Sequence, residues 1–146
     1  MNLEFLIQIG TLLSIVFGVA AFFWGIMSYN RQMNAQVFME YTKRFDEIMQ
    51  SFPSGWAERL DSDQVPPEPS NAVSTSVLRY LNLCSEEYYL CKSGYLSKKV
   101  WGIWEAELKR TLRTRLFRRE WLKLSSEFQA YPDFSSYVEA TQRQMP

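Results

Sequence analysis

The chain has 146 residues, and its 16 basic and 16 acidic side chains balance to a formal net charge of zero. This length allows one modest domain beside a membrane segment. The sequence contains no histidine and only 2 cysteines, which excludes zinc sites built on imidazole or on four thiolates. Ser–His–Asp and Cys–His catalytic arrangements are excluded for the same reason.

The first predicted element is a transmembrane helix at the N-terminus. Residues Phe5 to Met27 are apolar except for Gln8, Thr11 and Ser14. At about 1.5 Å per residue, a helix of this length crosses the ~30 Å hydrocarbon layer. A cleaved signal peptide is disfavoured because no basic residue precedes the run and no small-x-small cleavage site follows it. A buried core helix is disfavoured because the remaining chain is too short to surround it.

The positions of the basic residues predict the orientation of this segment. Arg31, Lys43 and Arg44 follow the apolar run, and cytoplasmic flanks retain basic residues. We therefore expect a single-pass protein of the cell inner membrane with residues 1–30 as its anchor. The N-terminus is expected outside and the C-terminal domain in the cytoplasm.

Small residues recur along one face of the predicted transmembrane helix. They lie three or four positions apart: Gly10, Ser14, Gly18, Ala21, Gly25 and Ser28. Small side chains allow two helices to approach closely in lipid. The stripe therefore predicts homo-oligomerisation or a partner membrane helix, in addition to contact with membrane lipid.

The helical pattern continues beyond the membrane segment. After Gly25, no proline or glycine occurs until Pro53, and apolar residues continue at helical spacing. Such spacing predicts a single helix from about Leu3 to Ser51. Because proline interrupts helices, we expect an acidic, proline-rich loop over residues 53–71.

Further helices are predicted from apolar periodicity and from residues that cap helices. The second has Asn71 or Ser74 as its cap, and Gly94 is suited to the left-handed conformation after its end. The expected ranges are from about 71–74 to Gly94, from after Ser97 through Leu112, from about Leu116 to Phe128, and a short helix after Pro132. No strand pattern is found, so the predicted fold class is all-α. We expect the transmembrane helix to continue into a cytoplasmic stalk packed in a small helical bundle, residues 31–146.

The sequence predicts no cofactor, metal site or small-molecule substrate. It contains no glycine-rich phosphate loop or dinucleotide-binding motif. Cys84 and Cys91 are separated by two helical turns, about 10 Å by helical rise, which is too far for a disulfide. They are expected to be buried small apolar residues. Adjacent helical residues point about 100° apart, so Glu86 and Glu87 do not converge on one atom unaided.

Basic residues are concentrated near the C-terminal end. Between Lys109 and Lys123 the chain has 7 cations and a single acid, Glu120. The predicted basic interaction stripe consists of Arg115, Arg118, Arg119 and Lys123. We interpret this stripe first as a set of residues that form salt bridges within or between subunits. Anionic lipid headgroups and nucleic acid are the alternatives.

Ordered motifs occur between Arg79 and Tyr137: S-E-E-Y-Y at residues 85–89, V-W-x-x-W at 100–104 and F-R-x-x-W at 117–121. In this order and spacing they resemble a family of uncharacterised, single-pass membrane-anchored helical proteins from bacteria. The resemblance implies no activity that can be transferred to this chain. From the same motifs we expect Glu86 or Glu87 to form a structural ion pair with Arg118.

These observations favour a non-enzymatic single-pass membrane protein whose cytoplasmic helical domain mediates self-association or partner recruitment. The alternative is a membrane-tethered protein that binds nucleic acid through the arginine-rich helix 109–123. A steep fall of binding with salt would distinguish the alternative, because phosphate contacts release counterions. An enzyme is the third hypothesis, and it rests on the carboxylates alone.

Overall fold

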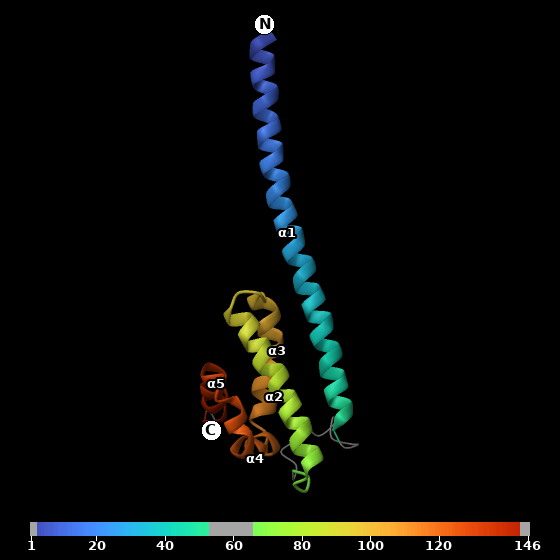
Figure 1. The fold of residues 1–146 in the computed structure, drawn as a ribbon, viewed down its shortest axis with the longest axis vertical. Coiled ribbons are helices and arrows are strands. Elements are labelled where there is room, and N and C mark those ends of the chain that lie inside the picture. Colours follow the sequence, from blue (N-terminus) through green and yellow to red (C-terminus); the bar gives the residue numbers. More distant parts are fainter. Residues whose placement is uncertain (1–2, 53–65, 144–146) are drawn as a thin grey trace. The chain divides into compact units, whose positions relative to one another are not determined.

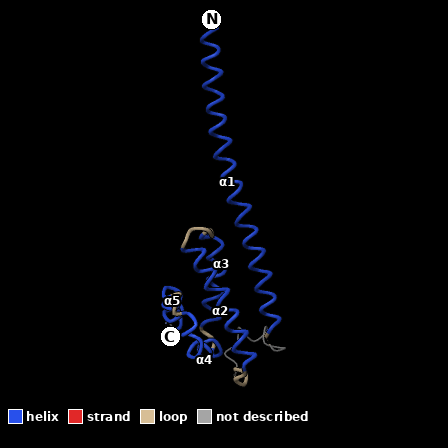
Figure 2. The backbone as a smooth tube through the Cα atoms, viewed as in Figure 1, coloured by secondary structure: helices blue, strands red, loops and turns tan. Residues whose placement is uncertain are grey.

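The computed structural model describes residues 3–52 and 66–143 of the chain. All the regular structure in these ranges is helical, and none of these residues lies in a β-strand (Figure 2). The fold is therefore all-α, as the sequence predicts.

The first helix, α1, extends from Leu3 to Ser51, which confirms the predicted range. By length and composition it is able to cross a membrane, and the most apolar part of it is fully exposed. The chain divides into two compact units, an N-terminal unit (residues 1–37) and a C-terminal unit (residues 38–146). The boundary lies within α1, a little after the boundary at residue 30 expected from the sequence.

The C-terminal unit contains the end of α1 and all the later helices, among which α2 and α3 lie side by side (Figure 1). The later elements are α2 (Asn71–Lys92), α3 (Lys98–Leu112), α4 (Arg115–Leu124), the short 3-10 helix η2 (Ser125–Phe128) and α5 (Pro132–Arg143). The predicted ranges are confirmed except for the fourth helix. Its last turn, from Ser125 to Phe128, is a separate 3-10 helix.

Hydroxyl side chains cap the N-termini of three of these helices. The Oγ atoms of Ser70 and Ser97 accept hydrogen bonds from the backbone N–H groups three residues later, and Thr114 does the same for α4. Such bonds satisfy backbone donors that have no partner within the helix. The prediction of Asn71 or Ser74 as the cap of α2 was wrong. Ser70 has the extended backbone that a cap requires, with φ of −145°.

The chain leaves α2 through Gly94 and enters it from the proline-rich segment. Gly94 has φ of +77°, which confirms the left-handed conformation predicted there. Residues 53–65 of the predicted loop 53–71 lie outside the described part of the chain. Residues 66–70 are not helical, in agreement with that prediction.

One apolar core connects the elements of the C-terminal unit. Its largest fully buried side chains are those of Phe117, Phe128 and Phe134. Ile48, near the end of α1, and Phe52, just after it, belong to the same core cluster. The helix that carries the exposed apolar segment (residues 5–27) therefore also contributes core residues to the C-terminal unit.

Candidate functional site

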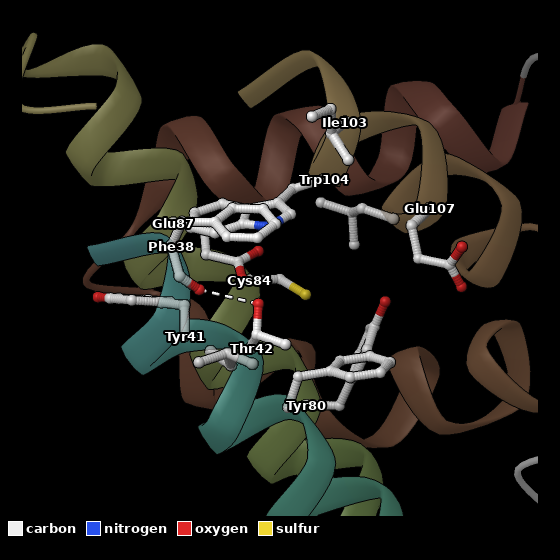
Figure 3. Close-up of a pocket in the computed structure, with 12 residues that line it drawn as sticks. Phe38, Tyr41, Thr42, Tyr80, Cys84, Glu87, Ile103, Trp104 and Glu107 are labelled. Carbon is white, nitrogen blue, oxygen red and sulfur yellow. Dashed lines mark hydrogen bonds between the residues drawn. The ribbon is translucent and has the colours of Figure 1, made fainter. Parts of the chain in front are cut away.

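A cavity of about 410 Å³ lies within the C-terminal unit (Figure 3). The end of α1, the middle of α2 and one face of α3 supply its walls. Pockets for small ligands have volumes of about 300–1,000 Å³ and mostly apolar walls. This cavity is in that range, and no pattern in the sequence predicts it.

One wall of the cavity consists of aromatic rings. Trp104 on α3 stacks with Phe38, with 5.8 Å between ring centroids and 8° between ring planes. Trp104 also stacks with Tyr41, with centroids 5.5 Å apart. Both partners belong to α1, so these contacts join α1 to α3, and all three residues line the cavity.

Glu87 is the polar side chain that distinguishes this cavity. It is only 7% exposed, and its side chain makes no hydrogen bond or ion pair with residues 3–52 or 66–143. Burial, which the charge of Arg44 partly opposes and the charge of Glu86 reinforces, raises the pKa of its carboxyl group to about 8. The neutral acid therefore predominates at pH 7.

Glu86, the adjacent carboxylate, has a different environment. Arg44 on α1 donates hydrogen bonds of 2.6 and 3.0 Å to its two oxygens, and the Tyr41 hydroxyl donates another of 3.2 Å. The hydrogen bond from Arg44 is the main reason that the pKa of Glu86 is below its ordinary value. The ion pair between Arg44 and Glu86 therefore joins α1 to α2.

The predicted ion pair between Glu86 or Glu87 and Arg118 was therefore wrong. Glu86 pairs with Arg44, because α1 lies against the face of α2 that carries the carboxylates. Arg118 lines a separate cavity with Trp121 and Gln142. Its Nε and Nη2 atoms are buried and have no hydrogen-bond partner among the described residues.

The rest of the predicted basic stripe is partly engaged within the C-terminal unit. Arg119 donates to Glu120 at 2.8 Å and to the Pro67 carbonyl at 2.6 Å. Lys123 lies 3.6 Å from Glu120. Arg115 is exposed. Two cations of the stripe therefore interact with an acid of their own helix.

Glu120 is fully buried, although it lies within the predicted basic stretch 109–123. The Ser74 hydroxyl on α2 donates a hydrogen bond of 2.6 Å to it. Burial alone would raise the pKa of Glu120, but the hydrogen bonds from Ser74 and Arg119 outweigh burial and hold that pKa below its ordinary value. The single acid within a run of basic residues was the available sequence signal.

The small-residue stripe is accessible in the N-terminal unit. Gly10, Gly18 and Gly25 have open space where a Cβ atom would lie. Ser14 donates its hydroxyl to the Gly10 carbonyl at 2.9 Å. Ala21 is exposed and Ser28 is half-buried. Apart from the local backbone, a Cβ atom at these glycines would therefore have no neighbour within 4 Å among the described residues.

Cysteine and acidic side chains do not gather into a cation site in the described ranges. Cys84 is buried at the cavity and Cys91 is half-buried, and both are free thiols. Burial is also the main cause of a strongly raised pKa of the Cys84 thiol. Among residues 3–52 and 66–143, no group of His, Cys, Asp and Glu residues has the arrangement needed to hold a metal ion.

Comparisons with protein-family models, curated proteins and solved structures find no match to this chain. The resemblance of residues 79–137 to uncharacterised membrane-anchored helical proteins therefore stays a prediction. Any functional conclusion depends on the residues of this chain alone.

Proposed function

We propose that this chain is a non-enzymatic, single-pass protein of the cell inner membrane whose cytoplasmic helical bundle mediates self-association or partner recruitment. The observation that supports this proposal most is that α1 contains both a segment able to span a membrane and residues of the apolar core. Its apolar segment is long enough to span a bilayer and is exposed, and its end contributes core residues to the C-terminal unit. Exposing such an apolar surface to water would be unfavourable, whereas exposing it to lipid is not.

The orientation follows from the basic residues after the apolar segment. Arg31, Lys43 and Arg44 place positive charge on the C-terminal side, and this charge is retained in the cytoplasm. Protease treatment of spheroplasts and of inverted membrane vesicles tests the topology, with an epitope at the C-terminus. The epitope is expected to be protected in spheroplasts and cleaved in inverted vesicles. The reverse pattern, or extraction of the protein by alkaline carbonate, would contradict the proposal.

Self-association is assigned to the stripe of small residues in the apolar segment. Gly18→Ile adds bulk where a Cβ atom would have no contact within 4 Å apart from the local backbone, so we expect its effect to report on a second helix. We expect this change to reduce the signal of a membrane two-hybrid assay several-fold, because close packing replaces the hydrophobic effect between helices in lipid.

The matched control for Gly18 is the neighbouring Val19→Ile. Val19 is 52% exposed and lies outside the stripe, so its enlargement should leave the signal unchanged. Equal signals from both variants would remove the stripe from the proposal and assign association to the C-terminal unit.

Nucleic-acid binding is the alternative function. Its support is the concentration of basic residues at 109–123. The engagement of Arg119 and Lys123 by Glu120 weakens this alternative, because paired cations are less available to phosphate groups.

A further inference from the structure

The cavity of the C-terminal unit contains a side chain that the membrane-anchor proposal does not use. Glu87 is buried at the cavity without a hydrogen bond or ion pair from any described residue. Its oxygens are not among the fully buried polar atoms without a partner, so they are accessible from the cavity. A carboxyl group without a protein partner at a cavity of ligand size is therefore a candidate binding group.

The charged neighbours of Glu87 are already engaged by other partners. On α1, Arg44 gives both of its hydrogen bonds to Glu86. On α3, Glu107 lines the cavity and accepts a hydrogen bond from Arg110. Lysine and arginine are absent from the described residues that line the cavity. The titratable groups that face Glu87 are Tyr41 and Arg44 on α1, Tyr80, Cys84 and Glu86 on α2, and Glu107 on α3.

The walls around Glu87 favour a positively charged group with an apolar body. Trp104, Phe38 and Tyr41 present aromatic rings at the cavity, and the face of an aromatic ring attracts cations. Leu83 and Ile103 supply apolar surface. An anion would meet two carboxyl groups, whereas an ammonium group would meet a carboxyl group and aromatic side chains.

We propose that this cavity binds a small organic amine, with Glu87 as the partner of the ammonium group and the aromatic wall around its apolar body (Figure 3). The proposal does not depend on membrane anchoring or on self-association. In the free protein the carboxyl group of Glu87 is protonated at pH 7, because burial raises its pKa to about 8. Amine binding therefore displaces the proton from Glu87.

The test is calorimetric titration of the full-length protein in nanodiscs of neutral lipid, with empty nanodiscs as the blank. Phenethylamine, phenethyl alcohol and hydrocinnamate share an aromatic body and differ in charge. We expect phenethylamine to bind about tenfold or more tightly than phenethyl alcohol, and hydrocinnamate to bind most weakly. Equal binding of the amine and the alcohol, tightest binding of hydrocinnamate, or binding of none of them would overturn the proposal.

Glu87→Gln keeps the volume of the side chain and removes its charge. We expect this variant to lose about tenfold or more of its affinity for phenethylamine and none for phenethyl alcohol. The matched control is Glu139→Gln on α5, which removes an exposed carboxylate paired with Arg143 and should bind like the unchanged protein. An unchanged amine affinity in Glu87→Gln would overturn the proposal.

Proton release supplies a second readout. Titrations at about pH 7 in buffers of different ionisation enthalpy should show release of about one proton for each phenethylamine bound. In Glu87→Gln this release should vanish even where some binding remains. Release of the same number of protons by the variant would assign the proton to another group and contradict the role of Glu87.

Discussion

At the residue scale, Glu87 makes the stability of the C-terminal unit depend on pH. The pKa of its carboxyl group is about 8 in the folded chain, against an ordinary value of 4.5 that applies to the unfolded chain. The folded protein therefore holds this proton more tightly than the unfolded one, and stability falls as the pH rises from about 4.5 to about 8. The greatest slope for a single group is about 1.4 kcal/mol per pH unit.

Glu87→Gln removes this pH dependence. Thermal unfolding of the full-length protein at about pH 5 and about pH 7.5 should show the variant gaining roughly 3 kcal/mol relative to the unchanged chain at the higher pH. Glu139→Gln, on the exposed side of α5, serves as the control and should follow the unchanged chain. A constant difference between Glu87→Gln and the unchanged chain would contradict the raised pKa.

Glu120 has the opposite dependence, because its pKa is lowered. Its carboxylate stabilises the fold above the ordinary carboxyl pKa, and this contribution is lost as the pH falls through the lowered value. Glu120→Gln removes the charge that accepts hydrogen bonds from Ser74 and Arg119, and a hydrogen bond to a charged group contributes about 1.5–3 kcal/mol. We expect a loss of about 2 kcal/mol in thermal unfolding at neutral pH. Glu127→Gln, at an exposed position of η2, should cost almost nothing.

At the scale of elements, a glycine in the α2–α3 turn and a glycine inside α3 have different roles. Gly94 has φ of +77°, and open space surrounds the position of a Cβ atom there. Gly94→Ala should therefore destabilise by about 1 kcal/mol through backbone conformation alone. Gly102 lies inside α3, also with open space, and Gly102→Ala should stabilise by about 1 kcal/mol. Thermal unfolding of both variants measures the contrast, and shifts of the same sign would contradict this account.

The elements of the C-terminal unit are joined by polar as well as apolar contacts. Arg44 joins α1 to α2 through Glu86, and Glu120 joins α4 to α2 through Ser74. The first pair is 36% and 45% exposed, so water screens it and its contribution is modest. The second is fully buried on the glutamate side. We therefore expect α4 to depend more strongly on its polar contact than α1 does.

At the scale of the whole molecule, the proposal predicts a homo-oligomer that contains no nucleic acid. The mass of the detergent-purified protein should be unchanged by nuclease, and its absorbance at 260 and 280 nm should be that of protein alone. The physical reason is that Glu120 already engages Arg119 and Lys123. A complex that loses mass on nuclease treatment would favour the basic helix as a nucleic-acid site.

Within the described residues, the sequence alone determined most of the secondary structure. The range of α1, the approximate ranges of α2 and α3 and the conformation of Gly94 were predicted, whereas the cap of α2 and the end of α4 were not. These features are local: apolar spacing, proline, glycine and capping hydroxyls act over a few residues. The sequence also revealed a segment apolar and long enough to span a membrane.

Only the tertiary structure decided which charged groups meet. Glu86 and Glu87 are neighbours in sequence, yet one pairs with Arg44 and the other is buried at a cavity without a partner. Arg44 carries no sequence signal for its partner Glu86, and Glu120 carries none for Ser74, because these partners lie in helices distant along the chain. Helical periodicity tells which face a residue occupies, but the neighbour of that face depends on how all the helices pack around the core.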